Sequence, residues 1–375
     1  MSEQFSIGVE EEYQIVDAKG ALMPGGKKVV HQAQGEVGNQ AQHELFLSQI
    51  EIGTPVCENL SQARDEIKRL RRAVIDAAAA SDARIVAAST HPFAVPGEQP
   101  ITPKVRYVEM AEDYQQLARD FFICGCHVHV GIGDRELAIG IMNRARGWLS
   151  PLVALAANSP FWRGGDSGYA SFRTEVWRRW PMAGSPQVFK NRAEYDALVR
   201  TLVETGSISD ETKIYWDIRP ADRFETIEFR ACDVCVSLDD AVAIAGLCRA
   251  IARQCAMDIE NDERRGAVFV PVRPELLRAA EWRSARYGLE ETLIDVHAGA
   301  TIPAHELISR LLETVRPALE ANGDWDEVSA LTQQILDRGN GARRQREAYA
   351  KRNSWDDVMQ FLADETGNGT RINTD

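Results

Sequence analysis

The sequence has no apolar run that approaches the roughly 20 residues needed to cross a bilayer as a helix. Its first residues, Met1 to Gln4, have neither the basic start nor the apolar stretch of a signal peptide. We therefore expect a cytoplasmic protein that does not bind membranes. The 7 cysteines are an odd number in a chain without export signals, which favours reduced thiols over a disulfide framework.

Basic residues are scarce relative to acidic ones. The 43 lysines and arginines oppose 56 aspartates and glutamates, giving a formal net charge of −13 over 375 residues. Because no dense basic surface is expected, nucleic acids and anionic membranes are unfavoured partners. A nucleotide would also be repelled, unless metal ions bridge an acidic site to its phosphates.

The spacing of apolar residues predicts an α+β chain with antiparallel strands, without the regular βαβ alternation of a dinucleotide-binding fold. Strands are predicted at residues 5–16, 44–53, 84–89, 124–132, 213–218 and 225–236. Helices are predicted at residues 61–80, 107–119 and 135–157, and mostly helical sequence runs from 238 to 362. Residues 161–192 are predicted to be irregular.

Three successive glutamates occupy the first predicted strand, in Gly8-Val9-Glu10-Glu11-Glu12-Tyr13. Side chains alternate between the faces of a strand, so Glu10 and Glu12 share one face, opposite Glu11 and Tyr13. Burying such carboxylates is costly without cations. An exposed acidic edge strand is the alternative, and the apolar residues of the opposite face argue against it.

A second strand carries two histidines, in Cys124-Gly125-Cys126-His127-Val128-His129-Val130-Gly131. The same alternation places His127 and His129 on one face, and Cys124 and Cys126 on the other. A structural zinc site with thiolate and imidazole ligands is therefore unfavoured, because the thiols face away. Paired carboxylates and paired imidazoles on strand faces indicate a divalent-metal site, with ordinary buried histidines as the alternative.

Two more glutamates are candidate metal ligands. Glu51 is an acid inside an otherwise apolar strand, and Glu44 lies seven residues earlier. That odd spacing puts them on opposite faces of one continuous strand. Both can join the same site only if a bend or a helical turn separates them.

Arginines accompany the acids in two places. Glu228 and Arg230 share one face of the strand predicted at 225–236, as a metal ligand beside a phosphate-binding arginine or as a simple salt bridge. Arg173 begins a segment rich in arginine and tryptophan, which suits binding of a carboxylate or phosphate. A solvated basic loop is the alternative there.

Taken together and in this order, these motifs resemble the family-2 glutamate–cysteine ligases, or carboxylate–amine ligases, of the glutamine-synthetase-like superfamily. The resemblance runs from about Phe5 to Leu362 and includes Thr90-His91-Pro92-Phe93, Asn158-Ser159-Pro160-Phe161 and Arg286-Tyr287-Gly288. It implies an α+β fold with a bent antiparallel sheet of the glutamine-synthetase-like catalytic type, flanking helices and a mostly helical C-terminal part.

The resemblance also implies the domain organisation. We expect one catalytic domain over residues 1–365, with a strand-rich site part at 5–236 and a helical layer at 238–362. Residues 366–375 are expected to form a disordered tail.

The resemblance further implies a set of site residues around ATP and two or three Mg²⁺ ions. Glu12, Glu44 and Glu51 would bind one ion, and Glu10, His127 and Glu228 a second. Arg230, Arg173 and Glu228 are the expected catalytic residues, with both arginines meeting the transferred phosphate or a substrate carboxylate. His129, Arg230 and Lys213 are the expected nucleotide-binding residues.

The implied activity is ATP-dependent formation of a γ-glutamyl amide between glutamate and cysteine or another small amine, through an acyl phosphate. A homodimer is expected only by analogy with other members of the superfamily. Two alternatives stay open from the sequence: a metal-dependent hydrolase, suggested by His-Val-His on a strand, and a non-catalytic metabolite-binding or regulatory protein on the same scaffold. Phosphoryl transfer to a guanidine is a third, minor alternative.

Overall fold

The computed structural model of the chain describes residues 5–95 and 97–370. Its centre is a seven-stranded sheet of order β2-β3-β1-β5-β9-β8, with β4 paired to β1. Every pairing in this sheet is antiparallel, which confirms the predicted α+β class. The strands are β1 (Ile7–Val16), β2 (Ala41–His43), β3 (Gln49–Gly53), β4 (Arg84–Val86), β5 (Gly125–Gly131), β8 (Ile218–Pro220) and β9 (Thr226–Asp233).

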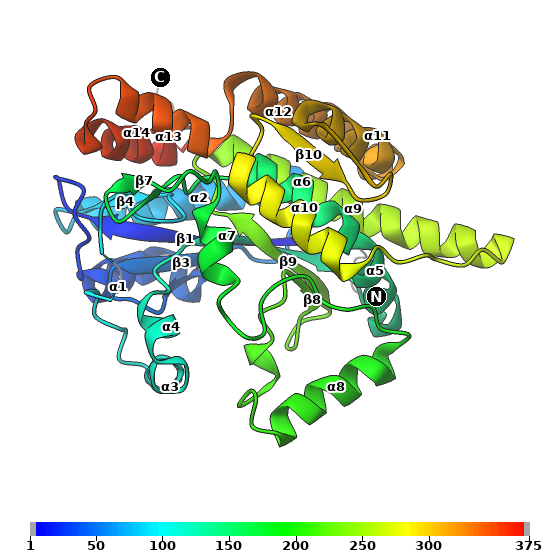
Figure 1. Cartoon of the computed structure of the whole chain (residues 1–375). Helices are drawn as coiled ribbons and strands as arrows, with labels where there is room; N and C mark the ends of the chain where they lie inside the picture. Colours follow the sequence, from blue (N-terminus) through cyan, green and yellow to red (C-terminus); the bar gives the residue numbers. More distant parts are fainter. Residues whose placement is uncertain (1–4, 96, 371–375) are drawn as a thin grey trace.

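Helices cover one side of this sheet and border the other. Figure 1 shows α10 to α14 stacked on one side, whereas α3, α4 and α8 extend on the opposite side. The helices are α1 (Gly26–Val37), α2 (Leu60–Ala79), α3 (Val105–Tyr114), α4 (Gln116–Arg119), α5 (Arg135–Ala145), α6 (Leu149–Ala156), α7 (Phe172–Trp177), α8 (Arg192–Glu204), α9 (Leu238–Arg265), α10 (Pro274–Tyr287), α11 (Ala304–Asn322), α12 (Trp325–Arg338), α13 (Gly341–Ala350) and α14 (Trp355–Gly367). In the described part of the chain, no helix combines the length and the apolar character of a membrane span.

The local sequence explains two of the helices that pack against the sheet. Helix α2 begins where the side chain of Asn59 accepts a hydrogen bond from the backbone of Gln62, and its apolar stripe is buried. Helix α9 is buried almost all round over its first half, because small and branched apolar residues occupy nearly every position there. It ends at Gly266, which adopts the left-handed conformation.

Several sequence-based boundaries are wrong. Of the strand predicted at 44–53, only β3 forms, and residues 44–48 make a bend that follows β2. The strand predicted at 213–218 begins only at Ile218, after a 3-10 turn. The long helix at 135–157 is interrupted by a second 3-10 turn, and the irregular segment 161–192 contains α7 and the short hairpin β6 (Phe161–Trp162) and β7 (Gly165–Asp166). The hairpin β10 (Thr292–Asp295) and β11 (Ala300–Pro303) interrupts the helical layer. Short apolar segments carry too little periodicity to separate these alternatives.

Ordered structure also extends beyond residue 365. Thr366 is fully buried and its hydroxyl accepts a hydrogen bond from the backbone of Ala87, 2.8 Å away. Thr370 is buried as well. The expected disordered tail therefore differs from the structure at 366–370, and its remainder, 371–375, lies outside the described residues.

A buried ion pair fixes the face of β1 that packs against the helices. Glu11 and Arg71 are both fully buried, and the guanidinium donates to the carboxylate at 2.5 Å and 2.9 Å. The hydroxyl of Tyr13 donates to the same carboxylate at 2.5 Å. Although burial opposes its charge, Glu11 raises the pKa of Arg71 above its ordinary value. With Glu11 held on this face, alternation directs Glu10 and Glu12 to the other.

We predict that Arg71→Leu lowers the free energy of unfolding by about 3–5 kcal/mol, because it leaves the carboxylate of Glu11 buried without a positively charged partner. Urea denaturation measures this loss. The neighbouring Arg72 is the matched control: it is 42% exposed and pairs with Asp76 one turn away, so Arg72→Leu should cost less than about 0.5 kcal/mol. Equal losses in the two variants would contradict a structural role for the buried pair.

Candidate active site

The strand register places the predicted acids and imidazoles in adjacent positions across the sheet. Glu12 lies opposite Glu51 in the β1–β3 pair. Glu10 lies opposite His127 in the β1–β5 pair, and His129 lies opposite Glu228 in the β5–β9 pair. Because directly opposite side chains lie close on the same face, these residues form one continuous polar row.

This polar row is the floor of a cavity of about 400 Å³. The size is within the range of small-molecule sites. The structure brings all but one of the predicted site residues into its lining: Glu10, Glu12, Glu44, Glu51, His127, His129, Arg173, Glu228 and Arg230. Helix α3 and the segment from α7 to β8 add aromatic and basic side chains, among them Arg106, Tyr107, Trp177, Trp180 and Tyr215.

Lys213 is the predicted residue that the structure does not bring into the lining. Its side chain is buried in the 3-10 turn Glu211–Lys213, and the cavity is lined from this turn by Thr212. Burial and the charge of Arg106 lower the pKa of Lys213. A nucleotide-binding role for Lys213 stays a prediction that this geometry does not favour.

The first cluster of ligands consists of Glu12, Glu44 and Glu51. The bend between β2 and β3 supplies what the odd spacing requires, and brings Glu44 to the same cavity as Glu51. Burial, and then the charges of Glu10 and Glu44, raise the pKa of Glu51 well above its ordinary value. Burial and Glu44 raise the pKa of Glu12 to about 8. In the absence of a cation, the carboxyl group of Glu12 would hold a proton at neutral pH.

The second cluster consists of Glu10, His129 and Glu228, whose ligand atoms all lie within 4.8 Å of one another. Nε2 of His129 lies 3.5 Å from Glu10 and 3.9 Å from Glu228. Nδ1 of the same ring lies 3.0 Å from the hydroxyl of Thr226, which orients the imidazole. The geometry therefore groups His129 with these two carboxylates, where the sequence-based assignment has His127.

His127 is close to this cluster without belonging to it. Its Nδ1 lies 3.4 Å from Glu10, and its buried Nε2 has no hydrogen-bond partner. Burial and the nearby Arg230 lower the pKa of His127 to about 4. The imidazole is therefore neutral at physiological pH and free to act as a ligand or a hydrogen-bonding group.

Two arginines neutralise Glu228 at the other end of the row. Arg219 donates to its carboxylate at 2.8 Å and Arg230 pairs with its second oxygen. Burial raises the pKa of Glu228, but the two guanidinium groups outweigh it and hold the pKa below its ordinary range. Sequence reasoning missed Arg219, because it lies opposite Glu228 on β8, a strand that was predicted too early in the chain.

A β-bulge and a tryptophan position Arg230 and Arg173. Between β5 and β9 the register shifts after Cys126, so β9 has one extra residue next to Arg230, and such bulges redirect side chains. Arg173 donates to the backbone carbonyls of Arg230 and Ala231, each at 3.2 Å. The ring of Trp177 lies 5.3 Å from one guanidinium and 5.4 Å from the other, distances typical of cation–π contact.

We predict that Glu12→Gln flattens the pH dependence of stability in the metal-free protein. The carboxyl has a pKa of about 8 in the folded state against an ordinary value of 4.5, so the folded state binds more protons between these values. The free energy of unfolding should therefore fall as pH rises from about 5 to 8, by on the order of 1 kcal/mol per pH unit from this group.

Urea denaturation with a chelator, at several pH values in this interval, measures that slope. Glutamine still accepts the hydrogen bond from the backbone of Gly125, which is 2.7 Å from Glu12, so the fold should persist. Adding Mg²⁺ to the unaltered protein should reduce the slope, because a bound cation replaces the proton. Parallel pH curves for the two proteins would contradict the assignment.

Comparison with known proteins places nearly the whole chain in one protein family. The family model described as glutamate–cysteine ligase family 2 matches residues 6–365. A protein of Rhodopirellula baltica named as a glutamate–cysteine ligase 2 is 46% identical over 347 residues, which are 91% of this chain and 92% of that protein. A protein of Frankia alni with a similar name is 42% identical over 376 residues, covering 96% and 97% of the two chains.

Solved structures share the fold at low sequence identity. The Francisella tularensis glutamate–cysteine ligase, in complex with AMP, aligns with a TM-score of 0.70 and 12% identity, over 99% of this chain and 89% of that one. A bifunctional glutathione synthetase from Pasteurella multocida aligns with a TM-score of 0.67 and 16% identity, over 97% of this chain and 52% of that one. These likenesses confirm the predicted α+β fold with an antiparallel sheet.

Proposed function

The chain belongs to glutamate–cysteine ligase family 2 and is an ATP-dependent carbon–nitrogen ligase, and from that premise we propose its substrates and the roles of its residues. It joins the γ-carboxylate of glutamate to cysteine or another small amine. One observation supports this most: two clusters of ligating groups and a pair of positioned arginines line the same cavity. A polyphosphate and a carboxylate could therefore be held next to each other.

Magnesium is the cation that suits the ligands. The cavity offers carboxylate oxygens and at most two imidazoles, while the thiols of Cys126 and Cys232 are buried in the apolar core instead. Mg²⁺ prefers hard oxygen ligands. Glu12, Glu44 and Glu51 would hold one ion and Glu10, His129 and Glu228 a second, with His127 beside it. Bound there, magnesium would neutralise charge on the phosphates of ATP.

The protein's own groups then account for the chemistry. A carboxylate does not condense with an amine in water, so it needs a leaving group. The γ-phosphoryl group of ATP passes to the glutamate carboxylate oxygen, which gives an acyl phosphate and ADP. Arg230 and Arg173 stabilise the charge on the transferring group and keep it aligned. The amine attacks the acyl carbon, loses a proton, and inorganic phosphate leaves.

The choice of glutamate and cysteine rests on the names of the relatives, which are glutamate–cysteine ligases. The cavity wall formed by Arg106, Trp180 and Tyr215 is where selectivity for the amine would be determined. We also propose a cytoplasmic location, which the seven free and buried cysteines favour. The proposed substrates are small molecules. The homodimer stays a prediction.

The proposed function is tested by measuring Mg²⁺-dependent ADP release with glutamate across a panel of amines, including cysteine. Release that needs both glutamate and an amine, with stoichiometric amide product, is the expected result. Cleavage of an amide substrate without ATP would favour a hydrolase. Nucleotide binding without turnover under any combination would favour a regulatory protein. Family membership favours neither of these alternatives.

We predict that Glu10→Gln lowers kcat/KM by about 100-fold or more, because it removes a charged ligand at the point where both clusters meet. Glu10 forms no ion pair with an arginine and is 31% exposed, so the substitution should leave thermal stability nearly unchanged. The matched control is Glu225→Gln, an exposed acid just before β9 that does not line the cavity. Activity of the Glu10 variant equal to that of the control would refute a ligand role for Glu10.

A further inference from the structure

The mouth of the cavity carries an aromatic side chain that the proposed chemistry does not use. Phe224 is 64% exposed and lines the cavity from the turn 221–225, between β8 and β9. Leaving most of a phenyl ring in water forgoes the favourable free energy of burying it. At the rim of a charged cavity, this exposed ring is available for a flat group of a bound substrate to stack on.

The other aromatic side chains that line the cavity are at least partly buried: Tyr107, Phe121, Trp177, Trp180 and Tyr215. Trp177, Trp180 and Tyr215 are each less than a tenth exposed. Their rings pack against one another at centroid separations of 5.3 Å and 5.9 Å. Among the described residues that line the cavity, Phe224 is the aromatic side chain classed as exposed.

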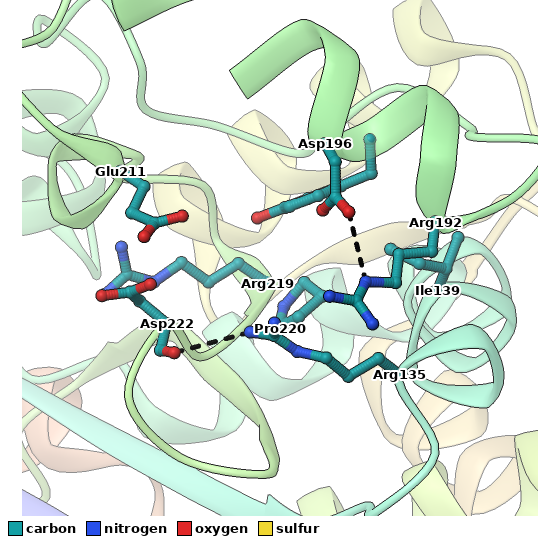
Figure 2. A pocket seen from close by; sticks show the side chains of 9 residues that line it. Arg135, Ile139, Arg192, Asp196, Glu211, Arg219, Pro220 and Asp222 are labelled. Carbon is teal, nitrogen blue, oxygen red and sulfur yellow. Dashed lines mark hydrogen bonds and ion pairs between the residues drawn. The ribbon is translucent and has the colours of Figure 1, made fainter. Parts of the chain in front are cut away.

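The turn that carries Phe224 is fixed at its base. The backbone of Ala221 donates to Thr226 at 2.9 Å, and the backbone of Ile132 donates to Glu225 at 2.8 Å. Arg135 donates to the carbonyls of Ala221 and Asp222 at 3.3 Å and 3.5 Å, and Figure 2 shows the contact with Asp222. The tip is thus presented by an anchored hairpin, which lowers the entropy lost when a ligand stacks on it.

The space beneath the turn is too small for a nucleotide base. Figure 2 shows this small cavity, bordered by Arg135, Asp196, Glu211 and Arg219. Its volume is about 40 Å³, which suits one or two waters. Phe224 lines the large cavity, which also contains the polar row, and does not line this small one.

Phe224 also lies next to the second ligand cluster. Its ring and that of His129 are in a T-shaped, edge-to-face arrangement, with centroids 6.3 Å apart and planes at 84°. His129 in turn lies between Glu10 and Glu228. A nucleotide whose phosphates are held at this cluster would have its sugar and base extending past His129 toward the rim.

We propose that Phe224 is the stacking platform for the adenine base of ATP. This inference rests on the proposed function, because it assumes that phosphates occupy the ligand clusters. Stacking on an aromatic ring recognises the flat face of a base and not its hydrogen-bonding edge. The platform therefore contributes affinity for nucleotides over polyphosphates that lack a base.

Calorimetric titration with Mg²⁺ and either ADP or inorganic tripolyphosphate tests this platform. Phe224→Ala should weaken ADP binding by about 5- to 150-fold and leave tripolyphosphate binding unchanged. Phe224→Leu should resemble the alanine variant, because it is apolar but lacks a π face, whereas Phe224→Trp should retain the affinity. Since the residue is exposed, none of these variants should change the thermal midpoint appreciably.

Unchanged ADP affinity in Phe224→Ala, or an equal loss for both ligands, would overturn the platform. A rise in KM for the amine alone, with ADP affinity intact, would also overturn it and would assign Phe224 to the acceptor. If the unaltered protein bound neither ADP nor tripolyphosphate, the proposed function would fail. Binding of both by the unaltered protein with no effect of Phe224→Ala would remove only the platform.

Discussion

Four of the carboxylates that line the cavity lie close together, and the cost of burying them side by side is the constraint on which the rest of the structure depends. Glu10, Glu12, Glu44 and Glu51 come from β1 and from the bend between β2 and β3. Burial, and then the charges of neighbouring carboxylates, raise the pKa of Glu12 and of Glu51, which is the cost of holding them here without a cation. The opposite face of β1 has to be fixed firmly to keep them there, and the buried contact of Glu11 with Arg71 does so.

Positive charge is placed at the other end of the same row, where it neutralises Glu228. Arg219 and Arg230 are paired with Glu228, and Arg173 is held against the bulge of β9 by backbone contacts. Acids at one end suit cations that carry a polyphosphate, and guanidinium groups at the other suit the group being transferred. This arrangement also explains how a chain with a net charge of −13 can use an anionic nucleotide.

Strand alternation made much of this site predictable. The faces of Glu10, Glu12, His127 and His129 follow from a period of two, and the structure has them lining the cavity. Which histidine joins Glu228 could not be predicted, because the register between β5 and β9 depends on tertiary pairing and is shifted by the bulge.

The positions of Glu44 and Lys213 depend in the same way on turns whose sequences carry little periodic signal. The bend before β3 brings Glu44 to the cavity, whereas the 3-10 turn before β8 leaves Lys213 out of its lining.

The central claim, that the two clusters bind metal ions, is tested most directly by locating Mn²⁺ by anomalous diffraction in crystals grown with nucleotide. The account predicts one ion among Glu12, Glu44 and Glu51 and another among Glu10, His129 and Glu228; ions bound elsewhere, or nucleotide bound with no ion at either cluster, would contradict it.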